Sequence, residues 1–286
     1  MAVHRGKTFV GSADGLCELV DGRLVRFDLY AARQWMPGDA DEEEDDHGDD
    51  HGDGGHVDNE VTFEPPAEIV VRRLAVLDDV LWVATDTFLW RRDATWTRRT
   101  KGRYVDLCLH EGRLAGASSR HIFDFDGQRI GRYNLAASEQ DILAVASTGG
   151  ELVTLHDRGL SRLVGRRFEA LPGPAVPPGT TYRDVLGGAG LVVATSQGVH
   201  AWRDGRWSAI ELRPGWHDVR CLARGRPTEL WIGTARGAVR LEPDDPAATY
   251  RAVEYHPVGP VNDIAAADGA ATIATDAGLR RLPTQP

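Results

Sequence analysis

The 286-residue chain is poor in several residue types, and each shortage narrows its class. Its three cysteines, Cys17, Cys108 and Cys221, stand far apart, so neither a disulfide framework nor a cysteine-based zinc site is expected. We expect buried thiols in a reducing compartment. No apolar run approaches the ~18 residues that a membrane helix needs. The first residues hold no apolar signal segment, so we expect a cytoplasmic protein that does not engage a membrane.

The sequence also lacks sustained helical periodicity and the short motifs of common enzymes. Its apolar residues do not recur every three or four positions over the length of a helix, which argues against an α/β fold. It contains no Gly-x-Ser-x-Gly elbow, no phosphate-binding loop and no His-Glu-x-x-His pair. These absences favour a non-enzymatic role, and no cofactor is expected.

What the chain does contain is a unit that recurs about seven times at intervals of ~40 residues. In its clearest copy, residues 230–237, an apolar strand leads to a hydroxyl residue and a glycine turn. From the third copy onward the hydroxyl residues are spaced 36, 41, 39 and 41 positions apart, and we assign them to Ser118, Thr154, Thr195, Thr234 and Thr275. Asp-Gly turns then lead to outer strands. The sequence therefore predicts an all-β fold over residues 1–286, a single β-propeller of seven blades with three to four antiparallel strands each.

Residues 231–237 (Trp-Ile-Gly-Thr-Ala-Arg-Gly) resemble the propeller repeat of two-component regulators. The hallmark of that repeat is a Trp-Ile-Gly-Thr strand, a two-residue turn and a glycine, and looser copies cover nearly the whole chain. The resemblance implies a propeller fold and a general role in recognising a ligand or partner. In that family a membrane helix and a kinase module commonly follow the propeller. The sequence shows neither, so a sensor-kinase role is not implied.

Charge is distributed unevenly along the chain. The formal net charge is −10, yet residues 34–71 hold fourteen acidic residues and no Lys or Arg. The remainder holds 29 acidic and 33 basic residues, so the expected propeller body is mildly basic. Like-charge repulsion and frequent glycines predict a disordered acidic insertion over residues 36–66, between the first and second blades.

Three interpretations of this insertion stay open. The favoured one is a solvated loop that aids solubility. A second is a divalent-metal site that would use the imidazole and carboxylate donors of His47, Asp49, Asp50, His51, Asp53 and His56, although their spacing matches no zinc or EF-hand pattern. A third is a gate that folds back on arginines of the propeller mouth and competes with an anionic partner.

Aspartates recur just before an apolar pair at the start of the predicted inner strands. They are Asp106, Asp141, Asp184, Asp218 and Asp263, and Arg73 takes this place in the second blade. Because the fold repeats them, we interpret these carboxylates as structural acceptors for amides or hydroxyls of a neighbouring blade. The alternative is a ring of carboxylates that binds a cation or polar ligand in the channel.

Residues that break the repeat are better candidates for binding, because the fold does not require them. At the expected mouth they are Arg73, Arg120, His156, Tyr182, Arg183, Trp216, His217, Arg220 and Arg236. Arginine, histidine and aromatic side chains together are suited to an anionic small molecule or a peptide carboxylate.

The function favoured by the sequence is a recognition scaffold that binds a protein, a peptide or an anionic small ligand at the propeller mouth. One alternative is a metal-dependent propeller hydrolase or lyase with a carboxylate-lined central site. Another is a nucleic-acid-associated protein with an autoinhibitory acidic loop, which is less favoured because no basic stripe alternates with exposed aromatics. The sequence leaves the oligomeric state open. It also leaves open whether the last blade has three strands or takes a fourth from the N-terminus.

Overall fold

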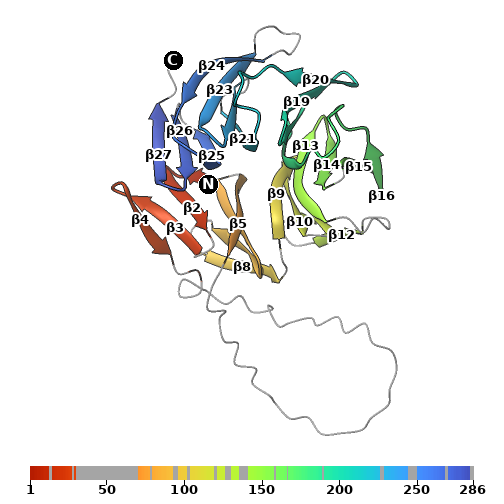
Figure 1. Ribbon diagram of the computed structural model, residues 1–286. Coiled ribbons are helices and arrows are strands. Elements are labelled where there is room, and N and C mark those ends of the chain that lie inside the picture. The colour runs from red at the N-terminus through yellow and green to blue at the C-terminus, as the bar shows by residue number, and fades with distance from the viewer. Residues whose placement is uncertain are drawn as a thin grey trace, which may run out of the picture.

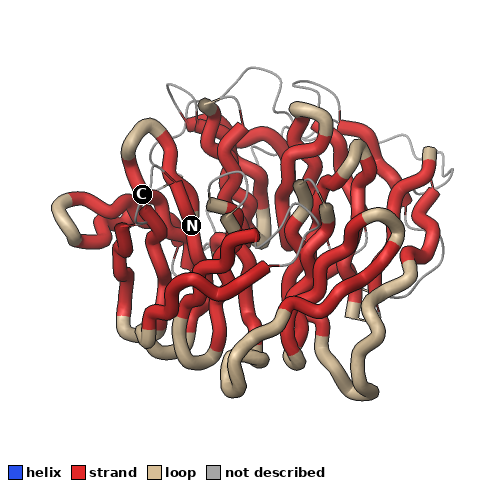
Figure 2. The backbone as a smooth tube through the Cα atoms, turned by 90° about the horizontal axis from the view of Figure 1, so that it is seen from above, coloured by secondary structure: helices blue, strands red, loops and turns tan. Residues whose placement is uncertain are grey.

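The computed structural model describes residues 1–12, 15–27, 29, 70–77, 79–92, 96–101, 104–118, 121–125, 130–134, 141–157, 159–165, 167–188, 190–225, 229–243, 250–267 and 270–283. These residues form 27 strands in seven antiparallel sheets, which surround one axis as the blades of a propeller (Figure 1). Loops and strands, without any helix, make up the described chain (Figure 2), so none of it could cross a membrane as a helix. The predicted fold class is confirmed. The predicted insertion, residues 36–66, lies outside the described residues.

The strands of each blade follow one another in chain order from the axis outward. Blades 1 and 2 contain β1 (Ala2–His4), β2 (Lys7–Ser12), β3 (Gly15–Val20), β4 (Arg23–Phe27), β5 (Val71–Leu77), β6 (Val80–Thr85), β7 (Phe88–Arg92) and β8 (Trp96–Lys101). Blades 3 and 4 contain β9 (Tyr104–His110), β10 (Arg113–Ser118), β11 (His121–Phe125), β12 (Ile130–Asn134), β13 (Ile142–Thr148), β14 (Glu151–His156), β15 (Gly159–Val164) and β16 (Arg167–Leu171). Blades 5 to 7 contain β17 (Tyr182–Leu186), β18 (Leu191–Thr195), β19 (Gly198–Arg203), β20 (Arg206–Ile210), β21 (Val219–Arg224), β22 (Leu230–Thr234), β23 (Ala238–Pro243), β24 (Tyr250–His256), β25 (Val261–Ala267), β26 (Ala270–Thr275) and β27 (Gly278–Pro283).

The repeated hydroxyl group closes the turn between the second and third strands of a blade. The buried Thr234 Oγ1 donates to the Gly237 carbonyl at 2.8 Å and accepts from the Gly237 amide at 3.1 Å. Thr195 and Thr275 donate in the same way to the glycine carbonyls three residues later. One side chain thus satisfies backbone groups that the tight turn would otherwise leave buried without partners.

In blade 4 the turn position belongs to a different residue from the one assigned by spacing. His156 pairs with Ile142 across the strands, as Thr195 pairs with Tyr182 in blade 5. Thr154 lies two residues earlier, and its hydroxyl contacts His156 Nε2 at 2.9 Å. The assignment of Thr154 to the repeated hydroxyl was therefore wrong, because β14 ends in histidine at that position.

A glycine in the second strand permits close approach of neighbouring strands at the axis. A Cβ on Gly233 would lie 2.4 Å from Cys221 Sγ and 2.6 Å from Val261 Cγ1, distances that no real side chain tolerates. The strand beside it and the next blade therefore both crowd this position, which explains why the clearest repeat carries glycine before threonine.

Buried apolar clusters join neighbouring blades at six interfaces. Each cluster combines side chains of two consecutive blades, from blades 1 and 2 through to blades 6 and 7. The Trp90 and Trp231 side chains are completely buried in such clusters, so these indoles serve packing.

Within the described residues, the first and last blades share no strand where the ring closes. Blade 7 has three strands in the described chain, and the N-terminal strand β1 forms the inner edge of blade 1. Of the two expectations for the last unit, the three-stranded blade is confirmed. The Met1 nitrogen donates to Asp263 Oδ2 of blade 7, across the junction of the two ends.

The turn hydroxyl is expected to contribute measurably to stability. Replacing Thr234 by Val keeps its volume but leaves the buried Gly237 amide and carbonyl without that partner, so unfolding free energy should fall by about 1–3 kcal/mol. Urea denaturation of Thr234→Val and Thr234→Ser measures this. Serine keeps the hydroxyl and should recover most of the loss; equal losses in the two variants would show that the hydrogen bonds are not the cause.

Candidate functional site

One position near the start of each of six innermost strands lines a cavity at the axis. A register shift near the start of each of these strands, β5, β9, β13, β17, β21 and β25, marks a bulge that re-aims the chain. The position at the bulge is occupied, in order, by Arg73, Asp106, Ala144, Asp184, Cys221 and Asp263. We call these residues, with the Met1 nitrogen of blade 1, the axial ring.

The carboxylates of the axial ring join consecutive blades through backbone amides. Asp106, which is 2% exposed, accepts from the Leu107 amide of its own strand and from the Val145 amide of blade 4, each at 2.8 Å. Asp184 accepts in the same way from Val185 and from Leu222 of blade 6, each at 2.8 Å. The interpretation of these two aspartates as structural acceptors is thus supported by their geometry.

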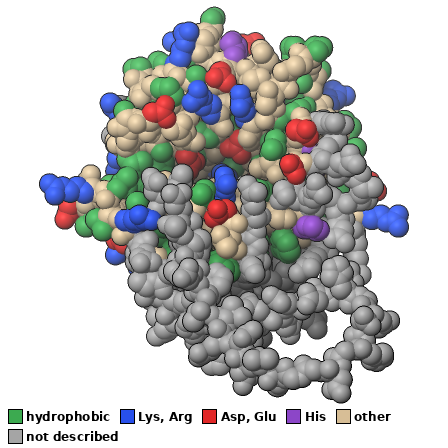
Figure 3. Space-filling view, turned by 60° about the horizontal axis from the view of Figure 1, so that its bottom comes forward, with side chains coloured by type: hydrophobic (Ala, Val, Ile, Leu, Met, Phe, Trp, Pro, Cys, Tyr) green, Lys and Arg blue, Asp and Glu red, His purple; other side chains and the backbone are tan. Residues whose placement is uncertain are grey.

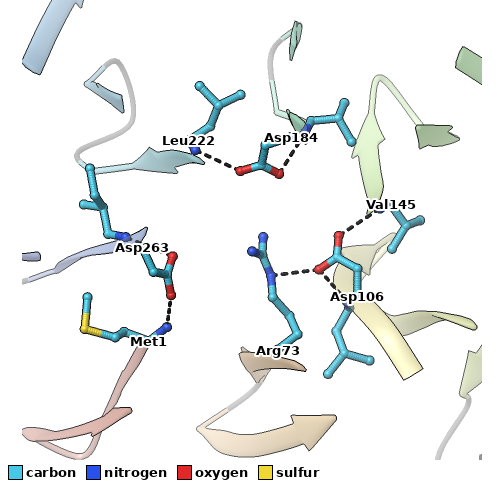
Figure 4. Close-up of polar contacts among 10 residues, drawn as sticks. Met1, Arg73, Asp106, Val145, Asp184, Leu222 and Asp263 are labelled. Atoms are coloured by element: carbon cyan, nitrogen blue, oxygen red, sulfur yellow. Dashed lines mark hydrogen bonds and ion pairs between the residues drawn. The ribbon is translucent and has the colours of Figure 1, made fainter. Parts of the chain in front are cut away.

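Asp263 repeats this arrangement at the ring junction. It accepts from the Ile264 amide at 2.9 Å and from the Met1 nitrogen, which stands where Val145 and Leu222 place their amides (Figure 4). Asp141 and Asp218 do not belong to the same set. Each lies three residues before the ring position of its blade, because Ala144 and Cys221 occupy the ring itself. The prediction of five equivalent aspartates was wrong in these two blades.

Arg73 supplies the positive side chain of the ring. Its Nε lies 2.8 Å from Asp106 Oδ1, and the end of its guanidinium points into the space between the blades (Figure 4). Asp106 raises the pKa of Arg73, so the guanidinium stays charged. Among the described residues, no partner contacts its two terminal nitrogens, which leaves a planar pair of donors in the channel.

Burial raises the pKa of two ring carboxylates, because it disfavours their ionised form. Desolvation raises the pKa of Asp184 to about 6, against the opposing effects of Arg73 and the two amides. Burial also raises the pKa of Asp106, although its ion pair with Arg73 opposes the shift. Charge in the ring therefore depends on pH in the mildly acidic range.

Two cavities meet at the axial ring. The mouth cavity, of about 550 Å³, lies on the side where the inner strands begin, and the basal cavity, of about 540 Å³, lies on the other side. Arg73, Leu74, Met1 and Asp263 line both. The ring is thus a charged constriction between two chambers. Figure 3 shows acidic and basic side chains around a hollow in one face of the molecule.

Three exposed arginines line the mouth cavity one residue before the ring. They are Arg72, Arg183 and Arg220, from blades 2, 5 and 6. Arg220 lies 3.9 Å from Asp218, while neither Arg72 nor Arg183 has an ion pair within the described part of the chain. Arg72 was missed in the sequence, although its shared register with Arg183 and Arg220, directly before the ring position, is the signal that could have identified it.

Of the other predicted mouth residues, most serve packing or lie away from the cavity. Trp216 is 8% exposed, stacks on Tyr255 with ring centroids 4.7 Å apart and carries Arg213 on its ring. His156 is 2% exposed in the turn of blade 4, and burial lowers its pKa.

Three more predicted residues remain partly or fully exposed. Tyr182 packs against the cluster of blades 4 and 5, where burial raises its pKa. His217 and Arg236 are exposed. Of the nine predicted residues, the mouth cavity therefore brings together Arg73, Arg183 and Arg220.

Several predicted ligands cannot be placed. Arg120 and the proposed metal ligands His47, Asp49, Asp50, His51, Asp53 and His56 lie outside the described residues. Within the described residues, no group of three or more His, Cys, Asp or Glu side chains has the arrangement of a metal site.

Comparisons with known proteins show the fold and leave the family open. No family model matches the chain, and no curated protein matches it. Among solved structures, virginiamycin B lyase from Staphylococcus aureus, in a catalytically inactive H270A form with quinupristin, is 12% identical with a TM-score of 0.68, over 98% of this chain and 91% of that one. The YCF48 protein bound to D1 peptide is 13% identical with a TM-score of 0.60, over 95% and 88% of the two chains.

A third similar structure is the extracellular domain of BT4673 from B. thetaiotaomicron, described as a one-component system. It is 12% identical with a TM-score of 0.66 and covers 99% of this chain, which spans 37% of that protein. The neighbours thus include extracellular domains of bacterial regulators, whereas the resemblance of residues 231–237 to the repeat of two-component regulators stays a prediction. At these identities the likeness concerns the fold alone.

The burial of Asp184 predicts a specific dependence of stability on pH. Its pKa is about 6 in the folded protein against an ordinary value of 3.8, so the folded state retains the proton over this range while the unfolded state loses it. Stability from this group is therefore full below pH 3.8 and is lost as pH rises through 6, by roughly 2–3 kcal/mol. Denaturation between pH 4 and 7 should show wild type losing stability relative to Asp184→Asn. Asp204→Asn, in an exposed turn, serves as control and should follow wild type; a constant difference between wild type and Asp184→Asn would contradict the prediction.

Proposed function

We propose that this propeller is a binding scaffold whose mouth cavity holds a carboxylate, carried by a peptide or by an anionic small molecule. The observation that supports this most is the convergence of Arg72, Arg183 and Arg220 around one cavity, above the terminal nitrogens of Arg73. Guanidinium groups bind carboxylates through paired, charge-assisted hydrogen bonds. A cavity of about 550 Å³ has the size of a small-molecule or peptide-end site.

The ring carboxylates do not cancel this positive rim. Asp106 and Asp184 lie deeper than the three arginines, and each already accepts two backbone amides. Arg73 offsets Asp106 directly at 2.8 Å. A ligand carboxylate at the rim therefore meets guanidinium donors first. The protein–peptide assemblies among the fold neighbours, such as YCF48 with D1 peptide, are compatible with such a role.

The two alternative functions receive less support. In a hydrolase or lyase with a carboxylate-lined centre, the acids would need to be available to substrate or metal, whereas Asp106 and Asp184 are engaged by the backbone. Nucleic-acid binding with an autoinhibitory acidic loop depends on residues that lie outside the described part of the chain. Both stay predictions, as does a cytoplasmic location.

The test compares matched pools of ligands. Isothermal titration would use a random tetrapeptide pool with free C-terminal carboxylates, the same pool amidated, and citrate as a small anion. Arg72→Gln/Arg183→Gln/Arg220→Gln should weaken binding of the carboxylate pool or of citrate by at least about tenfold, because a hydrogen bond to a charged group contributes about 1.5–3 kcal/mol. The citrate and peptide arms distinguish the two sources of the carboxylate.

A control variant with the same change in charge is available on the outer strands. Arg23→Gln/Arg167→Gln/Arg206→Gln removes three exposed arginines far from the axis and should bind as wild type does. If both triple variants bind equally, or if amidated and free peptides bind equally while citrate does not bind, the mouth is not a carboxylate site.

A further inference from the structure

The junction between blade 7 and blade 1 differs from the other six blade interfaces. Each of the six shares a buried apolar cluster, whereas no such cluster joins blades 7 and 1 among the described residues. The blue sheet of blade 7 and the red sheet of blade 1 lie side by side in Figure 1. Val10, Leu24, Ala274 and Leu279 line an extension of the mouth cavity between these two sheets. We call these four residues the open seam.

Leu279 of blade 7 is less buried than the equivalent residues of the other blades. In the third strand of each of the other six blades, the residue that follows the turn glycine position packs toward the next blade. Its side chain is at most 4% exposed. These residues are Leu16, Leu89, Ile122, Leu160, Val199 and Ala238. Leu279 holds the same position in β27, opposite Ala274, yet it is only half-buried. Across the seam, Leu24 of β4 is 49% exposed.

Among the described residues, blade 7 lacks the fourth strand that the other six blades have. In blade 5, Val199 pairs with Ile210 of β20, and in blade 4, Leu160 pairs with Leu171 of β16. In these two blades the fourth strand therefore places a large apolar side chain opposite the buried position. In blade 7, β27 is the last strand of the described sheet, and its outer edge has no partner strand there. Such an edge presents backbone donors and acceptors to an added strand.

The positive charge of β27 favours an added strand that carries acidic residues. Arg280 and Arg281 are both exposed, and neither has an ion pair within the described residues. Two copies of β27 paired across a twofold axis would bring these like charges together, which disfavours self-association. An extended peptide with acidic residues opposite the two arginines would instead be attracted.

We propose that β27 and the open seam bind an extended acidic–apolar peptide of a partner protein, as the fourth strand of blade 7. The strand pairing of β19 with β20 gives its register. Five consecutive residues of the peptide, numbered from its N-terminus, lie opposite Pro283, Leu282, Arg281, Arg280 and Leu279 in that order. The second and fifth should be apolar, and the third and fourth acidic. Backbone hydrogen bonds supply affinity, and the fifth side chain fills the seam beside Leu279 and Leu24.

The test uses capped synthetic peptides on the full chain. The probe is acetyl-Gly-Thr-Val-Glu-Glu-Ile-Gly-amide with a fluorescent label, and the comparison peptide, Gly-Thr-Glu-Val-Ile-Glu-Gly, has the same composition in the wrong register. Fluorescence anisotropy should show binding of the first and at least about tenfold weaker binding of the second. Equal binding of the two peptides, or none, would overturn the proposal.

Charge reversal tests the contact without touching the core. Arg280→Glu/Arg281→Glu should weaken binding of the probe at least about tenfold and should gain binding of the Lys-Lys version of the peptide. Both side chains are exposed, so the variant is expected to fold. Binding of the Lys-Lys peptide by the variant would verify directly that it has folded. Loss of the probe without recovery by the Lys-Lys peptide would count against pairing at β27.

Backbone pairing is tested separately from charge. Two versions of the probe, N-methylated on alternate residues, should differ, because one set of amides points to β27 and the other away from it. Equal affinities for the two would contradict strand addition. If sedimentation shows a dimer that Arg280→Glu/Arg281→Glu changes, the occupant is a second copy and the proposal fails.

This site is independent of the carboxylate site at the mouth. The probe carries no free C-terminus, and its two glutamates are placed opposite Arg280 and Arg281 in the proposed register, so Arg72→Gln/Arg183→Gln/Arg220→Gln should bind it as wild type does. A mouth that fails to bind carboxylates would therefore leave the result at β27 unaffected. Probe binding that disappears in the mouth variant and persists in Arg280→Glu/Arg281→Glu would assign the peptide to the mouth and overturn the proposal.

Discussion

The hydrogen bond that a backbone nitrogen of one blade donates to an aspartate of the preceding blade is the constraint around which this propeller is organised. Asp106 reaches Val145, Asp184 reaches Leu222 and Asp263 reaches the Met1 nitrogen, each from an equivalent position on an inner strand. A buried carboxylate without such partners would be strongly unfavourable, so these contacts both fix the spacing of the blades and restrict what else the carboxylates can do. The third contact joins blade 7 to blade 1, at a junction where the part of the chain that the structure describes forms no buried apolar cluster.

The same geometry explains why the mouth is basic and the ring is acidic. Side chains at successive positions of an inner strand face different levels of the channel, so one residue separates the arginines of the rim from the aspartates below. Arg73 is the exception within the ring, and its pairing with Asp106 leaves two guanidinium nitrogens directed into the channel. The recognition proposed for the rim and the hydrogen bonds of the ring therefore involve neighbouring residues of the same strands.

The interface between blade 7 and blade 1 differs in its packing from the other six. Six interfaces each contain a buried apolar cluster, whereas the described residues form none at the seventh. Leu279 and Leu24 are left in partial contact with solvent as a result. The seam and the mouth belong to one continuous cavity, so two surfaces with different chemistry, one apolar with a strand edge and one rich in guanidinium, adjoin each other.

The period of the repeat, the turn hydroxyls and the recurring aspartates could be read from the sequence, because each depends on a few consecutive residues whose backbone needs are the same in every blade. The errors came where a strand began or ended a few residues differently: Thr154 lies two residues before His156, and Asp141 lies three residues before Ala144. Arg72 was not predicted as a mouth residue for a related reason. Only its position relative to a bulge shows that it lines the same cavity as Arg183 and Arg220.

The sequence by itself determined the architecture, since apolar alternation, glycine turns and the period suffice to specify small antiparallel sheets in series. The tertiary structure decided which side chains meet at the axis and which junction the described residues leave without a buried apolar cluster. Closing a ring brings together equal positions of blades far apart in the chain, and a shift of one residue at a bulge changes which side chains those are.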